Sequence, residues 1–402
     1  MIQAGSRAYW RATLALCLGS FMIFSNLYVT QPLLPMLAAD FQVSPLSASY
    51  SFTVSTLTLG LSLLVYGPLS DVLGRRGIML VTMAGVIVTT LALSQTSSYE
   101  MLLGLRAVQG FFLGGLPAIA VAYMGDEFDK EALMTAVGLY IGANTLGGIG
   151  GRLIGGFAGE SLGWANTFLV IAGVSLVVWL SFASLLPRSR NFQARPFHLR
   201  TMLGNMLDHL RNPVLLTAYL IGGFNFFIFI NQYSYITFVL GDAPYSLSPR
   251  FLGMLFLTYL TGTLGSALAG RAARRFPQPL CMAFGIVVLM LGSLCTLLPS
   301  LWAIILGFFI NSFGFFFAHS TNSSWVSRNA QHAKASASSL YLVFYYTGAS
   351  TGGIYLHPFW EWRGWTGVII GSLVVLVGTL SAALYLHRKT RVAGEVTNAV
   401  VC

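Results

Sequence analysis

The sequence predicts an all-α membrane protein with twelve transmembrane helices arranged as two six-helix halves. Hydrophobic residues make up 55% of the chain and charged residues 8%, a composition that excludes an ordinary soluble domain. Apolar runs of about 20 residues, the length that crosses a bilayer, recur along the chain. At 402 residues, twelve such runs with short loops leave no room for a separate soluble domain.

The apolar runs divide six plus six. The expected spans of the first half are 11–35, 47–70, 77–95, 100–124, 134–157 and 164–186. Those of the second half are 213–240, 249–270, 279–298, 301–325, 336–357 and 364–386. We therefore predict an N-terminal half at 1–186, a cytoplasmic basic linker at 187–212, and a C-terminal half at 213–402 with a short cytoplasmic tail. The linker, which contains Arg195 and Phe197, suits either an amphipathic helix on an anionic membrane surface or a plain connection.

The net charge of +10 could indicate nucleic-acid binding, but its distribution argues against that partner. If the loops alternate sides from an inside N-terminus, most of the lysines and arginines fall on the cytosolic side. Only Arg250 and Arg363 face outward, and Arg106 and Arg152 lie within spans. This positive-inside pattern predicts a multi-pass protein of the cell inner membrane with both termini in the cytoplasm.

A charged, glycine-containing stretch, GPLSDVLGRRGI, separates the second and third expected spans. Charged groups are costly in hydrocarbon, so we expect a membrane-surface turn. Its acid lies beside two arginines, which suggests a switchable ion pair or a contact with a helix end. The residues of this candidate switch are Gly67, Asp71, Gly74, Arg75 and Arg76.

A second, degenerate copy of this stretch, SALAGRAARR, follows the eighth expected span. Arg271, Arg274 and Arg275 are in register with the first copy, whereas the acidic position has become Gly270. The two copies predict an internal repeat, as in transporters built from two related halves.

The first copy resembles the signature G-x-x-x-D-[RK]-x-G-[RK]-[RK] of the major facilitator superfamily. Val72 stands where the family usually has a basic residue. The resemblance implies a twelve-helix secondary transporter in which this stretch controls conformational exchange.

The fourth expected span carries Arg106, Gln109 and Gly110. An arginine six residues inside a span needs a cavity or a polar partner, unless its side chain reaches the nearby outer surface. The spacing resembles the R-x-x-Q-G motif of the superfamily, which implies that these three residues take part in proton coupling.

The fifth expected span has glycines at four-residue spacing, which lets another helix pack closely. The spacing resembles G-x8-G-x3-G-P-x2-G-G, the pattern of proton-driven exporters in this superfamily. The residues are Gly138, Gly147, Gly151, Arg152, Gly155 and Gly156. Arg152 replaces the family's proline. It either binds a substrate group or helps to gate the outer mouth, or it has a structural role in which it reaches Glu160 or the outer surface.

The end of the first span, YVTQPLLP, followed by AADF, resembles a bacterial exporter branch that includes YnfM-type inner-membrane proteins.

Polar residues among aromatic ones suggest a small-molecule cavity, although helix packing explains many aromatics equally well. The candidate cavity residues are Asn26, Gln31, Asn225, Asn231, Gln232, Asn311, Tyr341 and Tyr345. His319 is either a proton carrier or an ordinary polar partner.

None of the twelve carboxylates falls at mid-membrane in the expected spans, so a permanently cationic substrate would find no buried counter-ion. We therefore expect proton-coupled efflux of a neutral or weakly anionic small molecule, by a monomer. The alternatives are a proton-symport uptake permease and a non-transporting membrane sensor. No phosphate-binding loop, catalytic triad or metal-ligand spacing is present in the sequence, so we expect no enzyme, cofactor or metal.

Overall fold

The computed structural model describes residues 1–194 and 199–401, so Arg195 and Phe197 of the linker lie outside the described residues. The described part contains ten helical stretches that are long and apolar enough to cross a membrane. Two of these, Glu131–Leu185 and Ser336–Thr390, are each 55 residues long. A break at Gly163 divides the first, and a break at Arg363 and Gly364 divides the second. If each divided stretch is counted as two spans, the described residues agree with the twelve-span layout that the sequence predicts.

The chain forms two compact units. The first comprises Met1–Leu199 and Thr237–Phe256. The second comprises Arg200–Ile236 and the residues from Leu257 onward. The predicted boundaries of the halves, at residues 186 and 213, stay a prediction.

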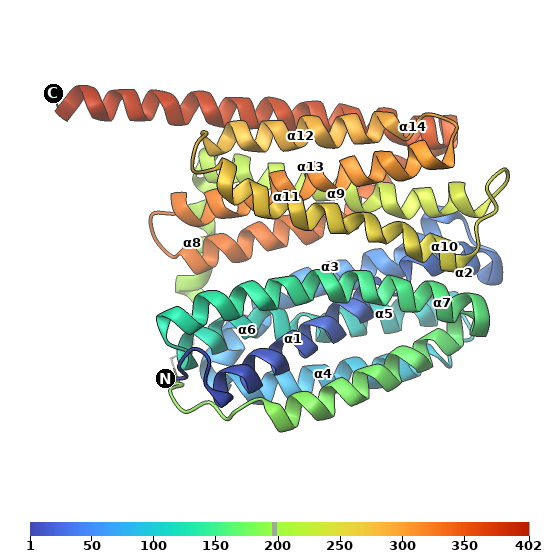
Figure 1. Ribbon diagram of the computed structural model, residues 1–402, viewed down its shortest axis with the longest axis horizontal. Coiled ribbons are helices and arrows are strands. Elements are labelled where there is room, and N and C mark those ends of the chain that lie inside the picture. The colour runs from blue at the N-terminus through green and yellow to red at the C-terminus, as the bar shows by residue number, and fades with distance from the viewer. Residues whose placement is uncertain (195–198, 402) are drawn as a thin grey trace. The chain divides into compact units, whose positions relative to one another are not determined.

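The helices of the first unit are shown in blue to green in Figure 1, except α10, which is yellow. They are α1 (Arg7–Tyr28), η1 (Gln31–Leu33), α2 (Leu34–Phe41), α3 (Pro45–Leu73), α4 (Arg75–Leu93), α5 (Tyr99–Leu113), α6 (Gly115–Glu127), α7 (Lys130–Leu185) and α10 (Pro249–Met254). Four of them begin at a side chain that accepts a hydrogen bond from the amide three residues on, which satisfies one unpaired donor of the first turn. These N-caps are Ser6, Ser44, Ser98 and Asp129.

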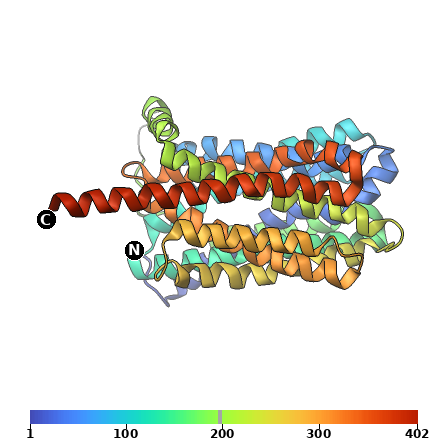
Figure 2. The ribbon, with the colours of Figure 1, turned by 90° about the horizontal axis from the view of Figure 1, so that it is seen from above.

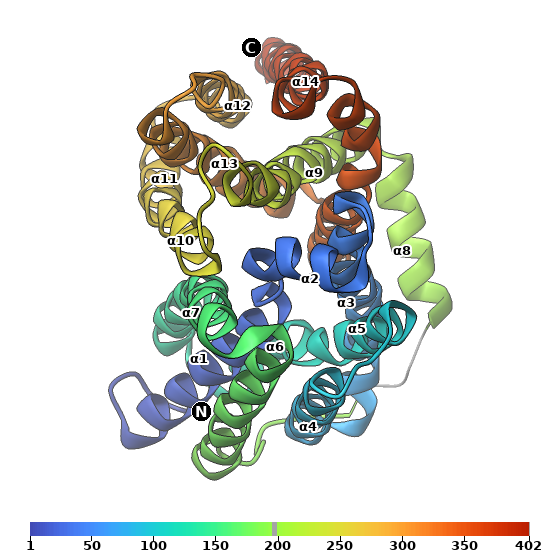
Figure 3. The same ribbon diagram turned by 90° about the vertical axis from the view of Figure 1, so that its right-hand side faces the viewer.

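The second unit contains the remaining helices. They are most of α8 (Leu199–Arg211), α9 (Pro213–Gly241) up to Ile236, the end of η2 (Leu255–Thr258), α11 (Tyr259–Ala272), α12 (Gln278–Cys295), α13 (Leu301–Asn329) and α14 (Lys334–Val401). Helix α13 packs against both α11 and α12, and the three are neighbours in the end-on view of Figure 3. In Figure 2, α12 and α13 run alongside one another in orange tones.

The stretch that the sequence analysis treats as one turn is mostly helix. Helix α3 continues through Pro68 to Leu73, and the chain reverses at Gly74, whose φ of 95° suits glycine. Arg75 already begins α4. The predicted turn is therefore present, but it is shorter than the gap expected at 71–76, because one glycine with positive φ connects the two helices.

Three spans are interrupted where the sequence analysis expects continuous helices. The first changes from α1 to η1 beyond Tyr28, the fourth divides at Gly114, and the eighth passes through η2. In the first span, Pro32 and Pro35 lack the amide hydrogens that a continuous α-helix needs. Such breaks leave backbone carbonyls that require other donors.

Candidate functional site

The break in the first span is the centre of the candidate site. Helix α1 ends at Tyr28, and the carbonyls of its last turn point toward a segment that no longer continues the α-helical ladder. Inside a membrane, water is not there to satisfy such carbonyls. Side chains from other helices must supply the donors.

Arg106 on α5 supplies them. Its Nη1 donates to the carbonyl of Asn26 at 3.1 Å and its Nη2 donates to that of Leu27 at 3.0 Å. Its Nε donates to the carbonyl of Ser51 at 2.7 Å. The side chain is fully buried, with 0% exposure, so it does not reach the outer surface. A positive charge at the C-terminal end of a helix is also favoured by the helix dipole.

A chain of hydrogen bonds extends from Arg106 through four helices. Arg106 Nη1 donates to the side-chain oxygen of Gln109, whose Nε2 donates to Thr90 Oγ1 at 2.7 Å. Thr90 Oγ1 lies 2.8 Å from Asn26 Oδ1 and donates to it. Asn26 Nδ2 donates to Ser175 at 2.8 Å. All five side chains are buried, so α1, α4, α5 and α7 share one polar network.

Gly110 permits the close approach that this network requires. A side chain at this position would collide with the backbone of Ser55 and with the hydroxyl of Thr58 on α3. The hydroxyl of Ser55 also donates to the carbonyl of Arg106 at 2.8 Å. The three residues of the R-x-x-Q-G motif therefore belong to one structural arrangement.

Arg152 holds the other side of the break. Its Nε donates to Gln31 Oε1 at 2.7 Å, and its Nη1 donates to the carbonyl of Gly148 at 3.1 Å. The guanidinium carbon lies 3.9 Å from the ring centroid of Tyr28 and 4.3 Å from that of Phe256. Aromatic faces attract a desolvated cation. Arg106 and Arg152 thus contact consecutive parts of the same broken span.

Glu160 is engaged elsewhere. It accepts hydrogen bonds from Ser248 Oγ at 2.6 Å and from the amide of Arg250 at 3.2 Å, at the start of α10. The guanidinium of Arg250 lies over the ring of Phe157 at 4.6 Å. The described residues contain no Arg152–Glu160 ion pair, so that alternative for Arg152 is wrong.

The glycine stripe of α7 packs directly on the backbone of α1. A side chain at any of three glycines would overlap the backbone of a residue on α1, at matching four-residue intervals. The pairs are Gly147 with Phe21, Gly151 with Ser25, and Gly155 with Val29. Gly156 faces the carbonyl of Pro249 on α10 instead, whereas Gly138 has no neighbouring atom within 4 Å of an added Cβ. The stripe therefore positions Arg152 beside the break.

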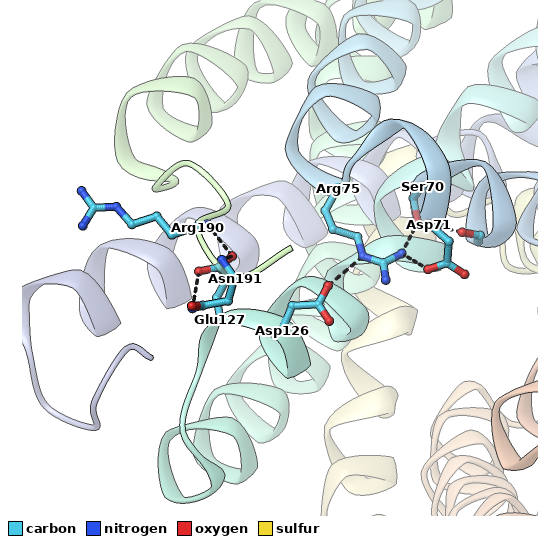
Figure 4. Close-up of polar contacts among 8 residues, drawn as sticks. Ser70, Asp71, Arg75, Asp126, Glu127, Arg190 and Asn191 are labelled. Carbon is cyan, nitrogen blue, oxygen red and sulfur yellow. Dashed lines mark hydrogen bonds and ion pairs between the residues drawn. The ribbon is translucent and has the colours of Figure 1, made fainter. Parts of the chain in front are cut away.

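The predicted switch residues meet at the junction of α3 and α4. Arg75 Nη1 lies 2.5 Å from Asp71 and donates to Ser70 Oγ at 2.6 Å. Its Nε donates to Asp126 at 3.1 Å, so the guanidinium lies between two carboxylates (Figure 4). Asp71 is 43% exposed at its side chain, whereas Arg75 is 9% exposed. The expected ion pair of Asp71 is present, and Asp126 is a second partner that the sequence analysis does not identify.

Arg76 and Glu127 tie this junction to the end of the first unit. Arg76 donates to the carbonyls of Ala183 at 2.7 Å and Leu186 at 3.2 Å. Glu127 accepts from the amides of Arg190 at 2.7 Å and Asn191 at 3.0 Å (Figure 4). An added Cβ at Gly67 meets no atom within 4 Å, so the structure gives this glycine no packing role.

The candidate cavity residues of the second unit fall into separate groups. Asn311 Nδ2 donates to Gln232 Oε1 at 2.8 Å and to Ser293 at 3.0 Å. Asn231 donates to the carbonyls of Phe227 and Ala349, each at 2.9 Å. These hydrogen bonds connect α9 to α12, α13 and α14.

The aromatic group of the second unit surrounds His319. Tyr341 Oη lies 2.9 Å from His319 Nδ1, and the ring of Tyr345 lies 4.7 Å from the imidazole ring. Tyr345 also stacks on Phe226 at 3.7 Å. Asn225 is buried on α9, with 3% exposure. The imidazole of His319 therefore has a fixed phenol partner within the second unit.

The structure is a bundle of membrane-spanning helices with buried polar groups at the breaks in its spans. Comparison with known sequences identifies the family. Residues 16–353 match the sequence profile of the Major Facilitator Superfamily. The chain belongs to this superfamily.

Two bacterial relatives of this superfamily member cover almost its whole length. It is 37% identical over 390 residues to the uncharacterized MFS-type transporter YybF of Bacillus subtilis, covering 97% of this chain and 96% of YybF. It is 36% identical over 388 residues to the inner membrane transport protein YnfM of Escherichia coli, covering 96% of this chain and 93% of YnfM. The chain is therefore a multi-pass transporter related to an inner-membrane protein.

A solved structure supports the fold. A bacterial homologue of the human lysosomal transporter Spinster, in an inward-facing and unoccupied conformation, matches with a TM-score of 0.72 at 15% identity. The match covers 95% of this chain and 96% of that one. At this identity the likeness shows the major facilitator fold alone.

Sequence reasoning misses several partners in the candidate site. Thr90 and Ser175 complete the Arg106 network, and Tyr28 forms the aromatic face beneath Arg152. Threonine and serine are common in membrane helices as small packing residues, so their positions carry no distinct signal. Tyr28, which directly precedes the break at the end of α1, is the one that the sequence could have indicated.

Proposed function

We propose that this transporter exports a neutral or weakly anionic small molecule in exchange for protons. The observation that carries the substrate class is the sign of the buried charge. Arg106 and Arg152 are both fully buried within spans. The only buried carboxylate among the described residues is Glu127, which lies at the end of α6 and accepts hydrogen bonds from the linker. A cationic substrate would meet repulsion without a counter-ion.

The fifth span supports the proposed direction of transport. The exporter-type glycine spacing is accompanied by close packing of α7 on α1 at three successive turns. This packing fixes α7 beside the break, where Arg152 contacts Gln31. A substrate that accepts hydrogen bonds could compete with Gln31 for the Arg152 guanidinium, which gives Arg152 the binding role proposed here.

Proton coupling requires a group that changes its charge. The guanidinium of Arg106 stays charged at any working pH, so it positions helices and does not carry the proton. We assign the carrier role to His319, whose imidazole is held by Tyr341. A neutral imidazole bonded at Nδ1 retains Nε2 for exchange.

The proposal is tested with proteoliposomes of known orientation and a pH-sensitive dye. Compounds for the assay are chosen by growth of a deletion strain on a panel of neutral and weakly anionic metabolites and drugs. Export predicts that a substrate added to inverted vesicles, with an acidic lumen, is accumulated while protons leave the lumen. Uptake by symport predicts that substrate and protons enter right-side-out vesicles together. Absence of proton movement in both orientations would favour a sensor and overturn transport coupling.

A further inference from the structure

A groove of about 930 Å³ lies beside the second copy of the charged motif, on α11, α12 and α13. Three arginines form one end of it, and apolar side chains form the walls. The arginines are Arg271, Arg274 and Arg275. The main apolar residues are Leu268, Phe276, Leu280, Phe284, Phe313 and Phe317. The groove thus combines a cationic end with an apolar channel, the two parts that an anionic amphiphile requires.

The two copies of the motif treat their arginines differently. In the first copy, Arg75 contacts Asp71 and Asp126, and Arg76 donates to backbone carbonyls. In the second copy, Gly270 occupies the position of Asp71, and an added Cβ there meets no atom within 4 Å. Within the part of the chain that the structure describes, the three arginines of the groove have no ion pair and no hydrogen bond from their side chains. All three are exposed, so their guanidinium groups are accessible to an anion from outside the chain.

The shape of the first copy provides a contrast. Its own hollow, about 260 Å³, is lined by Leu73, Gly74, Arg75, Arg76, Gly77, Arg188 and Ser189. Among the described residues, those that line this hollow include no aromatic side chain, although the ring of Phe192 lies 5.6 Å from the guanidinium of Arg75. Of these two hollows, the one beside the unpaired arginines has the aromatic lining, so charge and apolar surface lie together there.

The groove is distinct from the candidate cavity. Phe313 and Phe317 are four residues apart on α13 and therefore share a face. Phe315 and His319, two residues further along in each case, lie on the opposite face and contact the aromatic group of Tyr345. A ligand in the groove would not touch the proposed proton carrier.

We propose that the groove binds an anionic phospholipid of the surrounding bilayer. Its phosphate accepts hydrogen bonds from the guanidinium groups of Arg271, Arg274 and Arg275, which match phosphate geometry well. One acyl chain lies along Phe284, Phe313 and Phe317, of which Phe284 is 53% exposed and Phe317 is 4% exposed. Basic grooves between membrane helices on the cytosolic side bind lipid headgroups by this combination of charge and apolar contact.

The experiment uses the full-length protein in nanodiscs of zwitterionic phosphatidylcholine, with Phe284→Trp as a reporter. Phosphatidylglycerol with brominated chains is added in increasing mole fraction, and brominated phosphatidylcholine serves as the uncharged probe. The chain has eight tryptophans of its own. The quenching of the reporter is therefore obtained by subtracting the fluorescence quenching of the parent protein from that of the Phe284→Trp variant. We expect half-maximal quenching at a several-fold lower mole fraction of phosphatidylglycerol than of phosphatidylcholine.

The triple variant Arg271→Gln, Arg274→Gln, Arg275→Gln should remove this preference, with about a fivefold loss for each arginine. The matched control is Arg328→Gln, Arg388→Gln, Lys389→Gln, which removes the same charge from exposed residues outside the groove. It should keep the preference. Size-exclusion profiles and helical circular dichroism verify that each variant is folded.

Three outcomes would overturn the proposal. Equal quenching by the two lipids would show that the groove does not select an anion. Equal losses in the triple variant and its control would assign the preference to overall charge. Displacement of brominated phosphatidylglycerol by millimolar inorganic phosphate would indicate a site for free phosphate.

Discussion

Arg152 on α7 donates a hydrogen bond of 2.7 Å to the side-chain oxygen of Gln31, the first residue of η1. Arg152 stands where the exporter pattern has proline. Gln31 lies where the first span changes from an α-helix to a 3-10 helix, so the hydrogen bond connects α7 to this break. Both side chains are fully buried. An arginine that sequence reasoning can only describe as unusual is therefore part of the structure of the break.

The first prediction concerns this pair. Arg152→Leu should lower stability by about 2 kcal/mol, because it removes charge-assisted hydrogen bonds and leaves Gln31 buried without that donor. Gln31→Leu should also destabilise, and the double variant should lose less than the sum of the two. Thermal unfolding of the four proteins in detergent measures this coupling. Additive losses would contradict a direct interaction.

A different pair of variants tests substrate binding. If Arg152 binds substrate, Arg152→Gln should reduce the substrate-induced rise in melting temperature while the protein stays folded. Glu160→Gln is the matched control, since Glu160 interacts with the start of α10 and not with Arg152. A normal substrate-induced shift in Arg152→Gln would eliminate the binding role.

The second prediction concerns Arg106. Arg106→Ala should abolish proton-coupled transport, and Arg106→Lys should recover little of it. The guanidinium reaches the carbonyls of Ser51, Asn26 and Leu27 with three different nitrogens, whereas a lysine donates from a single nitrogen. The assay is substrate-dependent proton flux in inverted vesicles. Wild-type flux in Arg106→Ala would show that proton coupling does not require the helix contacts made by Arg106.

The third prediction separates the glycines of the exporter pattern. Gly151→Ala should strongly destabilise the protein, because the added methyl group would overlap the backbone of Ser25 on α1. Gly138→Ala should be neutral or stabilising by up to about 1 kcal/mol, since its site is open and alanine favours a helix. The yield of monodisperse protein and its melting temperature compare the two. A similar loss in both variants would mean that the contact with Ser25 is not the cause.

The fourth prediction concerns Asp71. Asp71→Asn should cost at most about 1 kcal/mol of stability, because the carboxylate is partly exposed and Arg75 keeps Asp126 and Ser70 as partners. The resemblance to the superfamily implies that this acid also contacts the start of the eleventh span when the transporter opens outward. We therefore expect slower turnover and a shift toward the inward-open state. Labelling of a cysteine in the cavity reports the shift, and unchanged labelling with unchanged transport would refute it.

The sequence predicts the helices of the bundle better than it predicts the contacts in the candidate site. Hydropathy and glycine spacing predict the spans and the exporter stripe, because each depends on residues close together in the sequence. The division at Gly163, and at Arg363 with Gly364, falls between spans that the sequence already separates. The turn at the charged motif is shorter than the gap expected at 71–76, because α3 continues as far as Leu73 and α4 begins at Arg75.

The sequence by itself determined that Arg106 and Arg152 lie at similar depth in membrane helices, since the depth of a residue follows from its count along an apolar run. Only the tertiary structure decided what each guanidinium binds. Arg106 contacts carbonyls about 80 residues away in sequence, and Gln31 is 121 residues from Arg152. Which donors meet which orphan carbonyls depends on how helices pack and where one of them breaks. Those are properties of the folded bundle, in which every buried polar group needs a partner.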